Sequence, residues 1–223
     1  FGRWWSIYRR FRRWALAGRW EALRYALAPA RSTESLLIDS TIIKAHPHAA
    51  GARTAAGGQE RQALGRSRGG LSTKIHLAVR GLGCPVRFHL TAGQRGDCPQ
   101  AEGLLSGLGP GTVGHVIADT AYDGDDLRQR VRRLRARACI KPNPTRKAKK
   151  RYDRKRYKHR NVVERFFNRM KNWRGLASRY DKHALTYRGG MVLASIVLWL
   201  ALSGVKAASN VPGLNGRNRA SPQ

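Results

Sequence analysis

A basic segment around residue 160 carries one carboxylate and has to bury one of its sides. Its polar residues follow the spacing Y-x2-R-x3-E-x6-K, at Tyr157, Arg160, Glu164 and Lys171. On a helix with about 100° per residue, these four side chains lie within about 60° of one another. The opposite arc is apolar and comprises Val162, Val163, Phe166, Phe167, Met170 and Trp173. The pattern predicts a helix over 157–176 that covers a core with one side and presents a single carboxylate among cations with the other.

The rest of the chain alternates between strand and helix patterns. Apolar or alternating runs predict strands at 36–43, 73–80, 86–91, 113–118 and 137–141. Further helices are predicted at 99–108, 123–135 and 186–203, and basic loops at 49–70 and 143–156. Asp97 and Asp123 are the expected N-caps of the first two helices. This order predicts an α/β fold in which three antiparallel strands precede strands joined by crossover connections, with helices flanking the mixed sheet.

The two ends of the chain differ from its centre. Residues 1–30 interleave aromatic residues with arginine in a helical pattern. They are expected to be either the last part of a helical DNA-binding region or an amphipathic helix that packs on the main domain. The apolar run at 191–202 is too short to span a bilayer and predicts a buried helix. The predicted organisation is therefore a helical region at 1–32, one domain at 33–205 and a disordered tail at 206–223.

The charge of the chain points to a polyanionic partner. It carries 44 Lys and Arg against 13 Asp and Glu, a formal net charge of +31. Between residues 128 and 174 there are 21 Lys and Arg and only two acids, and aromatic residues interrupt this run. Such a surface is typical of nucleic-acid binding. A membrane surface is disfavoured because the cations are not confined to one amphipathic helix.

Three carboxylates occupy unusual positions. Asp39 lies inside the apolar run at 36–43, where a charge is costly unless it is paired or bound to metal. Asp119 ends the strand at 113–118, where ligands gather in α/β sheets. The alternatives are an exposed edge or turn for Asp39, a helix cap for Asp119, and an intrahelical contact with Arg160 or Asn168 for Glu164. Together the three carboxylates could hold two Mg²⁺ or Mn²⁺ ions about 3.5–4 Å apart, the arrangement for phosphodiester displacement.

Other kinds of site are not indicated. Cys84, Cys98 and Cys139 contain no C-x-x-C pair, which disfavours a zinc ribbon or a disulfide framework and fits a reducing compartment. His46 and His48 have no third partner in the sequence pattern and are expected to be structural. The sequence contains neither a Walker-type phosphate loop nor a G-x-S-x-G nucleophile elbow.

Four motifs occur together in this chain: Ile-Asp-Ser-Thr at 38–41, Gly-Gly-Leu-Ser-Thr-Lys-Ile-His at 69–76, Ala-Asp-Thr-Ala-Tyr-Asp at 118–123, and the Y-R-E-K spacing. In these motifs the chain resembles the DDE transposases of bacterial insertion sequences, of the IS4/IS5 type, over about residues 33–203. The resemblance implies an RNase H-like catalytic domain in which Asp39, Asp119 and Glu164 bind two Mg²⁺ or Mn²⁺ ions. The chain begins at Phe1 and not Met, so we expect an N-terminally truncated family member.

The resemblance also implies partners and an activity. Tyr157, Arg160 and Lys171 would contact transposon-end DNA near the scissile phosphate, and Trp173 would either stack beside a base or pack in the core. The expected partner is double-stranded DNA, bound by a homodimer on paired ends, in the bacterial cytoplasm at the nucleoid, with no membrane and no small-molecule cofactor. The expected activity is strand cleavage followed by transfer of the 3′-hydroxyl ends to target DNA. The alternatives are an RNase H-like nuclease that does not join strands, and a non-catalytic DNA-binding relic.

Overall fold

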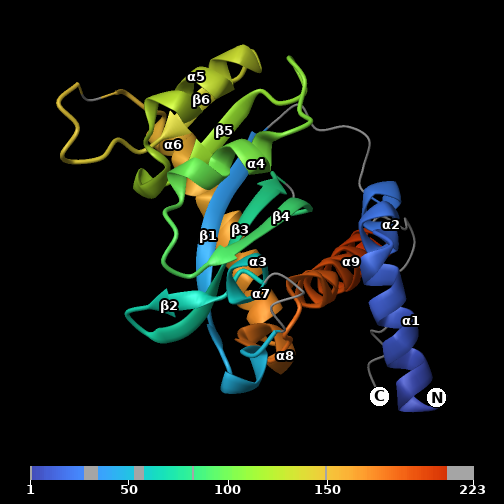
Figure 1. The fold of residues 1–223 in the computed structure, drawn as a ribbon. Coiled ribbons are helices and arrows are strands. Elements are labelled where there is room, and N and C mark those ends of the chain that lie inside the picture. Colours follow the sequence, from blue (N-terminus) through green and yellow to red (C-terminus); the bar gives the residue numbers. More distant parts are fainter. Residues whose placement is uncertain (1, 28–34, 53–57, 82, 149, 210–223) are drawn as a thin grey trace, which may run out of the picture.

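The structure is a computed structural model that describes residues 2–27, 35–52, 58–81, 83–148 and 150–209. Its core is a mixed sheet (Figure 1). The strands within the described residues are β1 (Ser35–Ala45), β2 (Gly65–Ser67), β3 (Gly70–Arg80), β4 (Pro85–Ala92), β5 (His115–Ala118), β6 (Arg137–Ile140) and β7 (Ser178–Arg179). β3 is antiparallel to β1, β2 and β4, whereas β5 is parallel to β1 and β6. This arrangement confirms the predicted α/β class and is consistent with an RNase H-like sheet.

Helices cover both faces of the sheet. They are α1 (Trp4–Leu16), α2 (Arg19–Leu27), α3 (Gly58–Arg61), α4 (Ala101–Leu105), α5 (Asp125–Arg133), α6 (Arg154–Tyr157), α7 (Asn161–Lys171), α8 (Arg174–Ala177) and α9 (Ala184–Ser209). The side chains of β1 alternate between the two faces. Leu37 and Ile43 join the apolar cluster that α7 and α9 complete. Leu36 and Ile38 join the cluster beneath α4 and α5. β1 is therefore buried on both sides, which explains its continuous apolar run.

The segment predicted as one helix over 157–176 is not continuous. α6 is followed by a 3₁₀ turn, Lys158–Arg160, before α7 begins, and α7 ends at Lys171. Trp173 then takes an extended backbone (φ −85°, ψ 115°) and precedes the short α8. The prediction of an uninterrupted helix was wrong at both ends, because periodicity records which face is apolar and does not detect such a break. Trp173 is 38% exposed and lies outside the core that its pattern predicted.

Two further local predictions need correction. The predicted loop at 49–70 contains β2, which pairs with β3 from Gly65↔Ser72 to Ser67↔Gly70 and thereby uses backbone groups along β3. The described part of that loop also contains α3, whereas residues 53–57 lie outside the described residues. Neither predicted N-cap makes a side-chain capping bond. Asp97 precedes the helical turn at 98–100 without one, and the N-cap of α5 is Gly124 and not Asp123. Both carboxylates are engaged elsewhere.

α1 and α2 pack on α9 (Figure 1). Gly189 of α9 allows the closest approach, since a Cβ there would lie 2.8 Å from the Cβ of Ala15. Glu21 pairs with Arg188 at 3.2 Å, and Arg24 Nη1 donates to the carbonyl of Pro85 at 2.7 Å. The alternative in which this region packs on the main domain agrees with these contacts, although the region forms two helices; its membership of a DNA-binding region stays a prediction.

α9 is longer than predicted at both ends. It reaches Ser209, beyond the predicted start of the tail at 206, and residues 210–223 lie outside the described residues. By length and composition alone, its stretch from Ala184 to Ala201 would suffice to cross a membrane, contrary to the expectation from the shorter apolar run. Tyr187, Met191 and Val192 are nevertheless buried in the core beside α7. Packing against α1, α2, α7 and β4 therefore accounts for the apolar residues on the buried side of this helix.

Candidate active site

β1 carries Asp39 in the middle of the sheet. The residue is 6% exposed and lies opposite Leu77 of β3 in the register. Its Oδ1 accepts a hydrogen bond from the backbone N–H of Ser40 at 2.9 Å, which fixes the orientation of the carboxylate. An exposed edge and a turn, the alternatives considered for this residue, are both excluded because Asp39 is buried and lies within a strand of the sheet.

Asp119 directly follows β5, the strand beside β1. It is the N-cap of the 3₁₀ turn Thr120–Tyr122, and its Oδ1 accepts from the N–H of Ala121 at 3.0 Å. The alternative of a capping role is thus correct, but the other oxygen of the same carboxylate lies 3.8 Å from Arg160 Nη2, which also contacts Asp39. A side chain held by its own turn is oriented before any ligand arrives.

Arg160 brings the three predicted carboxylates together. Its Nη2 lies 3.0 Å from Asp39 Oδ2 and 3.8 Å from Asp119 Oδ2, and its Nη1 lies 3.5 Å from Glu164 Oε1. The intrahelical contact considered for Glu164 is therefore present, yet the same guanidinium also reaches both strands. Two strands and one helix, separated by up to 125 residues in sequence, meet at one cation.

Burial and the attraction between Arg160 and the acids shift the pKa values of two groups in this cluster. Burial raises the pKa of Asp39, and the attraction of Arg160 does not fully offset this effect. The pKa of Arg160 is also raised: partial burial pulls it down, but Asp39 and Asp119 outweigh that pull. The two directions are compatible. Burial still disfavours the charged form of Asp39 because it shares Arg160 with other acids, whereas those acids together stabilise the charged form of Arg160.

Three other predicted residues lie around this cluster. Lys171 Nζ donates to Thr41 Oγ1 at 2.9 Å, two residues beyond Asp39 on the same face of β1. Tyr157 is half-buried. Burial raises its pKa, and a hydrogen bond with Arg160 lowers it by less than burial raises it. Trp173 makes no contact with the carboxylates among the residues that the structure describes. The fold thus gathers Tyr157, Arg160 and Lys171 with the three acids and leaves Trp173 apart.

A second polar cluster on the opposite face of β1 was missed from the sequence. Ser40 Oγ donates to Asp97 Oδ1 at 2.9 Å, and Lys74 Nζ lies 3.1 Å from the same oxygen. Lys74 also donates to the carbonyl of Arg95 at 2.7 Å, and His76 Nδ1 lies 3.6 Å from Asp97 Oδ1. Ser40 therefore connects Asp39 through its backbone with Asp97 through its side chain. The sequence feature that could have predicted this cluster is the pair Lys74 and His76, two residues apart in the apolar pattern of β3, so that both lie on one buried face of the strand.

A comparison with known protein families gives a match over most of the chain. The family model described as a transposase DDE domain matches residues 31–199. The chain belongs to this family. A putative transposase for insertion sequence element IS6501 of Brucella ovis is 46% identical over 131 residues, which cover 58% of this chain and 99% of that protein. An uncharacterized protein, y4sN, of Sinorhizobium fredii is 46% identical over 54 residues, which cover 24% of this chain and 43% of that protein.

Membership in the DDE transposase family indicates a metal-dependent enzyme that cleaves DNA. Three carboxylates form a hard oxygen donor set of the kind that Mg²⁺ and Mn²⁺ prefer, and here they already surround a cationic group. Within the described residues, no three His, Cys, Asp or Glu side chains are close enough to form a preassembled metal site. The chemistry of these carboxylates suits a divalent metal, and in this structure they are arranged around the guanidinium of Arg160.

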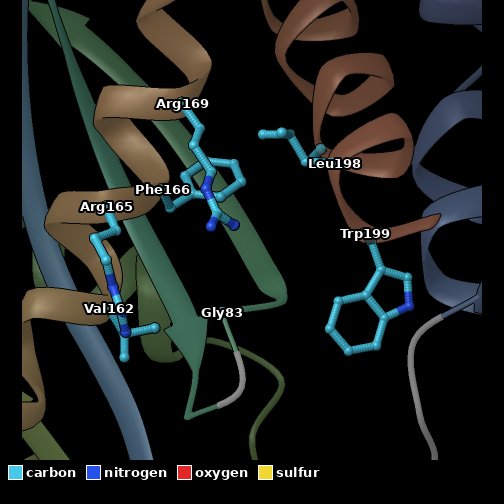
Figure 2. A pocket seen from close by; sticks show the side chains of 8 residues that line it. Gly83, Val162, Arg165, Phe166, Arg169, Leu198 and Trp199 are labelled. Carbon is cyan, nitrogen blue, oxygen red and sulfur yellow. The ribbon is translucent and has the colours of Figure 1, made fainter. Parts of the chain in front are cut away.

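A separate hollow lies between α7 and α9 (Figure 2). It has a volume of about 180 Å³, and Arg165 and Arg169 project into it from α7 together with Trp199 from α9. The carboxylates of the DDE transposase domain do not line it. The hollow is therefore distinct from the candidate active site.

Proposed function

We propose that this chain is a transposase that cleaves DNA at the ends of an insertion sequence and transfers the freed 3′-hydroxyl ends to target DNA. The observation that carries the proposal is the convergence of Asp39, Asp119 and Glu164 on one cation, within the span that matches the transposase DDE domain. We assign these three residues to catalysis and metal binding. The IS4/IS5 type of the family and an RNase H-like arrangement of the strands belong to the same proposal.

The three carboxylates have different freedom to move. Asp39 is fixed by burial in β1, and Asp119 by its own capping bond. Glu164 has a side chain that is 52% exposed and contacts only Arg160 in this cluster, so it is the acid that can adjust to a bound substrate. The chemistry supplied by two bound Mg²⁺ or Mn²⁺ ions would be activation of a water or a 3′-hydroxyl and neutralisation of the leaving oxygen.

The residues around the acids suit a DNA backbone. Tyr157, Arg160 and Lys171 lie beside the carboxylates, where a phosphodiester would meet positive charge. We propose that these three side chains contact the phosphates next to the scissile bond. Trp173, which is partly exposed, is the remaining candidate for a contact with DNA. Double-stranded DNA as the partner, a homodimer on paired ends and a place at the bacterial nucleoid belong to the same proposal.

The decisive experiment measures cleavage of DNA that carries the element's own ends. Wild type is compared with Asp119→Asn in Mg²⁺ and in Ca²⁺. We expect cleavage by wild type in Mg²⁺ only, and none by the variant. If both proteins bind DNA tightly and neither cleaves it, the chain is a non-catalytic relic and the proposal is wrong.

A joining assay separates transposition from simple hydrolysis. The cleaved ends are incubated with wild type and a plasmid target, and the joined product is sought on a gel. Appearance of a joined product supports strand transfer. Cleavage without any joined product, under conditions in which the ends stay bound, would favour an RNase H-like nuclease instead.

A further inference from the structure

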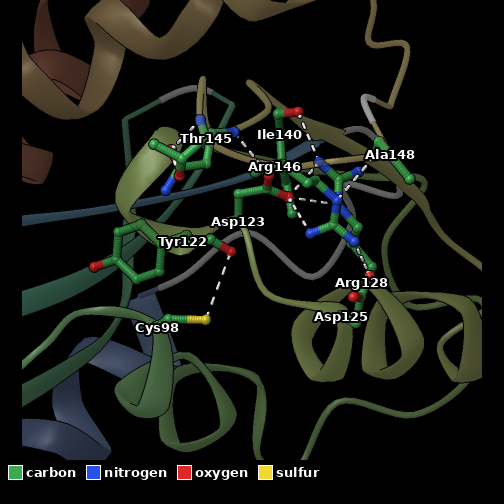
Figure 3. Close-up of polar contacts among 10 residues, drawn as sticks. Cys98, Tyr122, Asp123, Asp125, Arg128, Ile140, Thr145, Arg146 and Ala148 are labelled. Atoms are coloured by element: carbon green, nitrogen blue, oxygen red, sulfur yellow. Dashed lines mark hydrogen bonds and ion pairs between the residues drawn. The ribbon is translucent and has the colours of Figure 1, made fainter.

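A buried carboxylate lies one turn beyond Asp119. The side chain of Asp123 has no exposed surface. It accepts a hydrogen bond from Arg128 Nε at 2.8 Å, one from the backbone N–H of Asn143 at 2.8 Å, and one from Arg146 Nη1 at 3.4 Å (Figure 3). A buried carboxylate is stable only with such a set of donors. Asp123 therefore ties the chain after β6 to the segment that contains Asp119.

The contacts continue beyond Asp123 and fix the shape of residues 143–148. Arg146 Nη2 pairs with Asp125 at the start of α5, and Arg146 Nε donates to the carbonyl of Ala148 at 3.1 Å (Figure 3). The side chain of Asn143 accepts from the N–H and the hydroxyl of Thr145 at 3.1 and 2.9 Å. This stretch is thus held by its own hydrogen bonds as well as by Asp123.

Further along the chain, residues 152–160 lead back to the carboxylates. Tyr152 packs edge-on against Tyr157, with ring centroids 5.3 Å apart. Asp153 caps α6 by accepting from the N–H of Arg156 at 2.9 Å. The next turn carries Arg160, which pairs with Asp39. The basic residues between Asn143 and Arg156 are therefore held by contacts on both sides, near the candidate active site.

The cations of this segment are presented without partners from the protein. Lys147, Lys150 and Arg151 are exposed, and no ion pair joins them to a carboxylate among the described residues. A surface that is ordered before binding loses less conformational entropy when it meets its ligand. Uncompensated cations on an ordered segment suit a chain of phosphates.

We propose that residues 143–148, together with Lys150 and Arg151, form a preorganised arm that binds the DNA backbone beside the scissile phosphate, and that Asp123 is the positioning residue that holds it. This inference rests on the proposed function for the choice of DNA as the partner. Its distinctive claim is that a negative charge, Asp123, strengthens binding to a polyanion. Simple charge repulsion predicts the opposite.

The test measures affinity for a DNA duplex of random sequence, because backbone contacts carry little sequence information. Fluorescence anisotropy is recorded in Ca²⁺ for wild type, Asp123→Asn and the matched control Asp126→Asn. Each substitution makes the protein more positive by one unit, and Asp126 is an exposed residue in the same first turn of α5. We expect Asp126→Asn to bind as wild type or more tightly. We expect Asp123→Asn to bind more weakly by about three- to tenfold.

A second variant covers the case in which Asp123→Asn fails to fold, since it would leave the buried Arg128 without its carboxylate. Asn143→Ala removes the hydrogen bonds to Thr145 at constant charge and leaves the Arg128–Asp123 pair intact. We expect an unchanged melting temperature, faster tryptic cleavage after Lys147, Lys150 or Arg151, and weaker DNA binding.

Two results would contradict the proposal of a DNA-binding arm. One is an Asp123→Asn protein that folds and binds as tightly as Asp126→Asn. The other is an Asn143→Ala protein whose segment is freed for trypsin without any loss of affinity. Both measurements are made without cleavage chemistry, so failure of the arm is distinguishable from failure of the proposed transposase activity, which is read in Mg²⁺ with wild type.

Discussion

Arg160 Nη2 lies 3.0 Å from Asp39 Oδ2, and this contact joins the start of α7 to the centre of the sheet. The same guanidinium reaches Asp119 and Glu164. A single cation thus balances part of the charge of three acids. Any bound metal ion would have to share these oxygens with Arg160 or displace it.

Arg160→Gln tests this competition. Without metal, we expect the variant to be less stable by about 2 kcal/mol, because Asp39 is left buried without its partner. Adding Mg²⁺ or Mn²⁺ should raise its melting temperature more than that of wild type, since the competing cation is gone. Arg165→Gln, on another face of α7, is the control and should respond as wild type. An equal metal response in all three proteins would show that Arg160 does not occupy the cation position.

Glu164→Gln tests the assignment of the helix carboxylate. We expect DNA cleavage to fall by at least about a hundredfold, because a charged metal ligand is lost. DNA binding should be kept or improved, because one negative charge leaves the basic surface. Cleavage is measured in Mg²⁺ and binding in Ca²⁺, with the exposed Glu102→Gln as control. Undiminished cleavage by the variant would remove Glu164 from the site.

Lys74 and Asp97 form a pair that is 11% and 16% exposed, and we expect them to be strongly coupled. A cycle of Lys74→Met, Asp97→Asn and the double variant, followed by urea unfolding, should give a coupling free energy of about 1–3 kcal/mol. The pair of Arg130 and Glu102, whose acid is 69% exposed, serves as the comparison and should give less than about 0.5 kcal/mol. Equal coupling in the two cycles would show that burial adds nothing to the Lys74 contact.

His76 makes folding depend on pH. Its imidazole is fully buried, and burial lowers its pKa to about 4 from an ordinary value of 6.5. Between these two values the unfolded chain binds a proton that the folded chain does not. Stability is therefore lost as the pH falls through this window, by up to about 3 kcal/mol from this group.

His76→Gln should flatten that dependence, since a glutamine can keep the contact with Thr91 but does not titrate. Urea unfolding at several pH values between about 4 and 6.5 measures the effect. The exposed His159→Gln is the control and should keep the slope of wild type. A slope that His76→Gln leaves unchanged would show that other groups cause the acid sensitivity.

Much of the fold could be predicted because its signals are local. The apolar run around Asp39 and the alternation in β3 and β4 follow from burial of strand faces, and each lies within one element. Element boundaries were less predictable. The 3₁₀ turn before α7 and the extended backbone of Trp173 interrupt a helix that periodicity alone makes continuous. The strand β2 forms because it pairs with β3, a contact that no local pattern records.

The amino-acid sequence was enough to single out the rare acids of the candidate site and the cations around them, and to predict a polyanionic partner. These predictions follow from residue type and spacing, because the charge and the apolar periodicity of a segment can be counted from its residues. The folded structure was needed to show that Arg160 lies among all three carboxylates, that Asp97 accepts from Ser40 on the far face of β1, and that Asp123 contacts Arg146. Those contacts span long separations in sequence, and the pairing of strands and the packing of helices bring them within hydrogen-bonding distance.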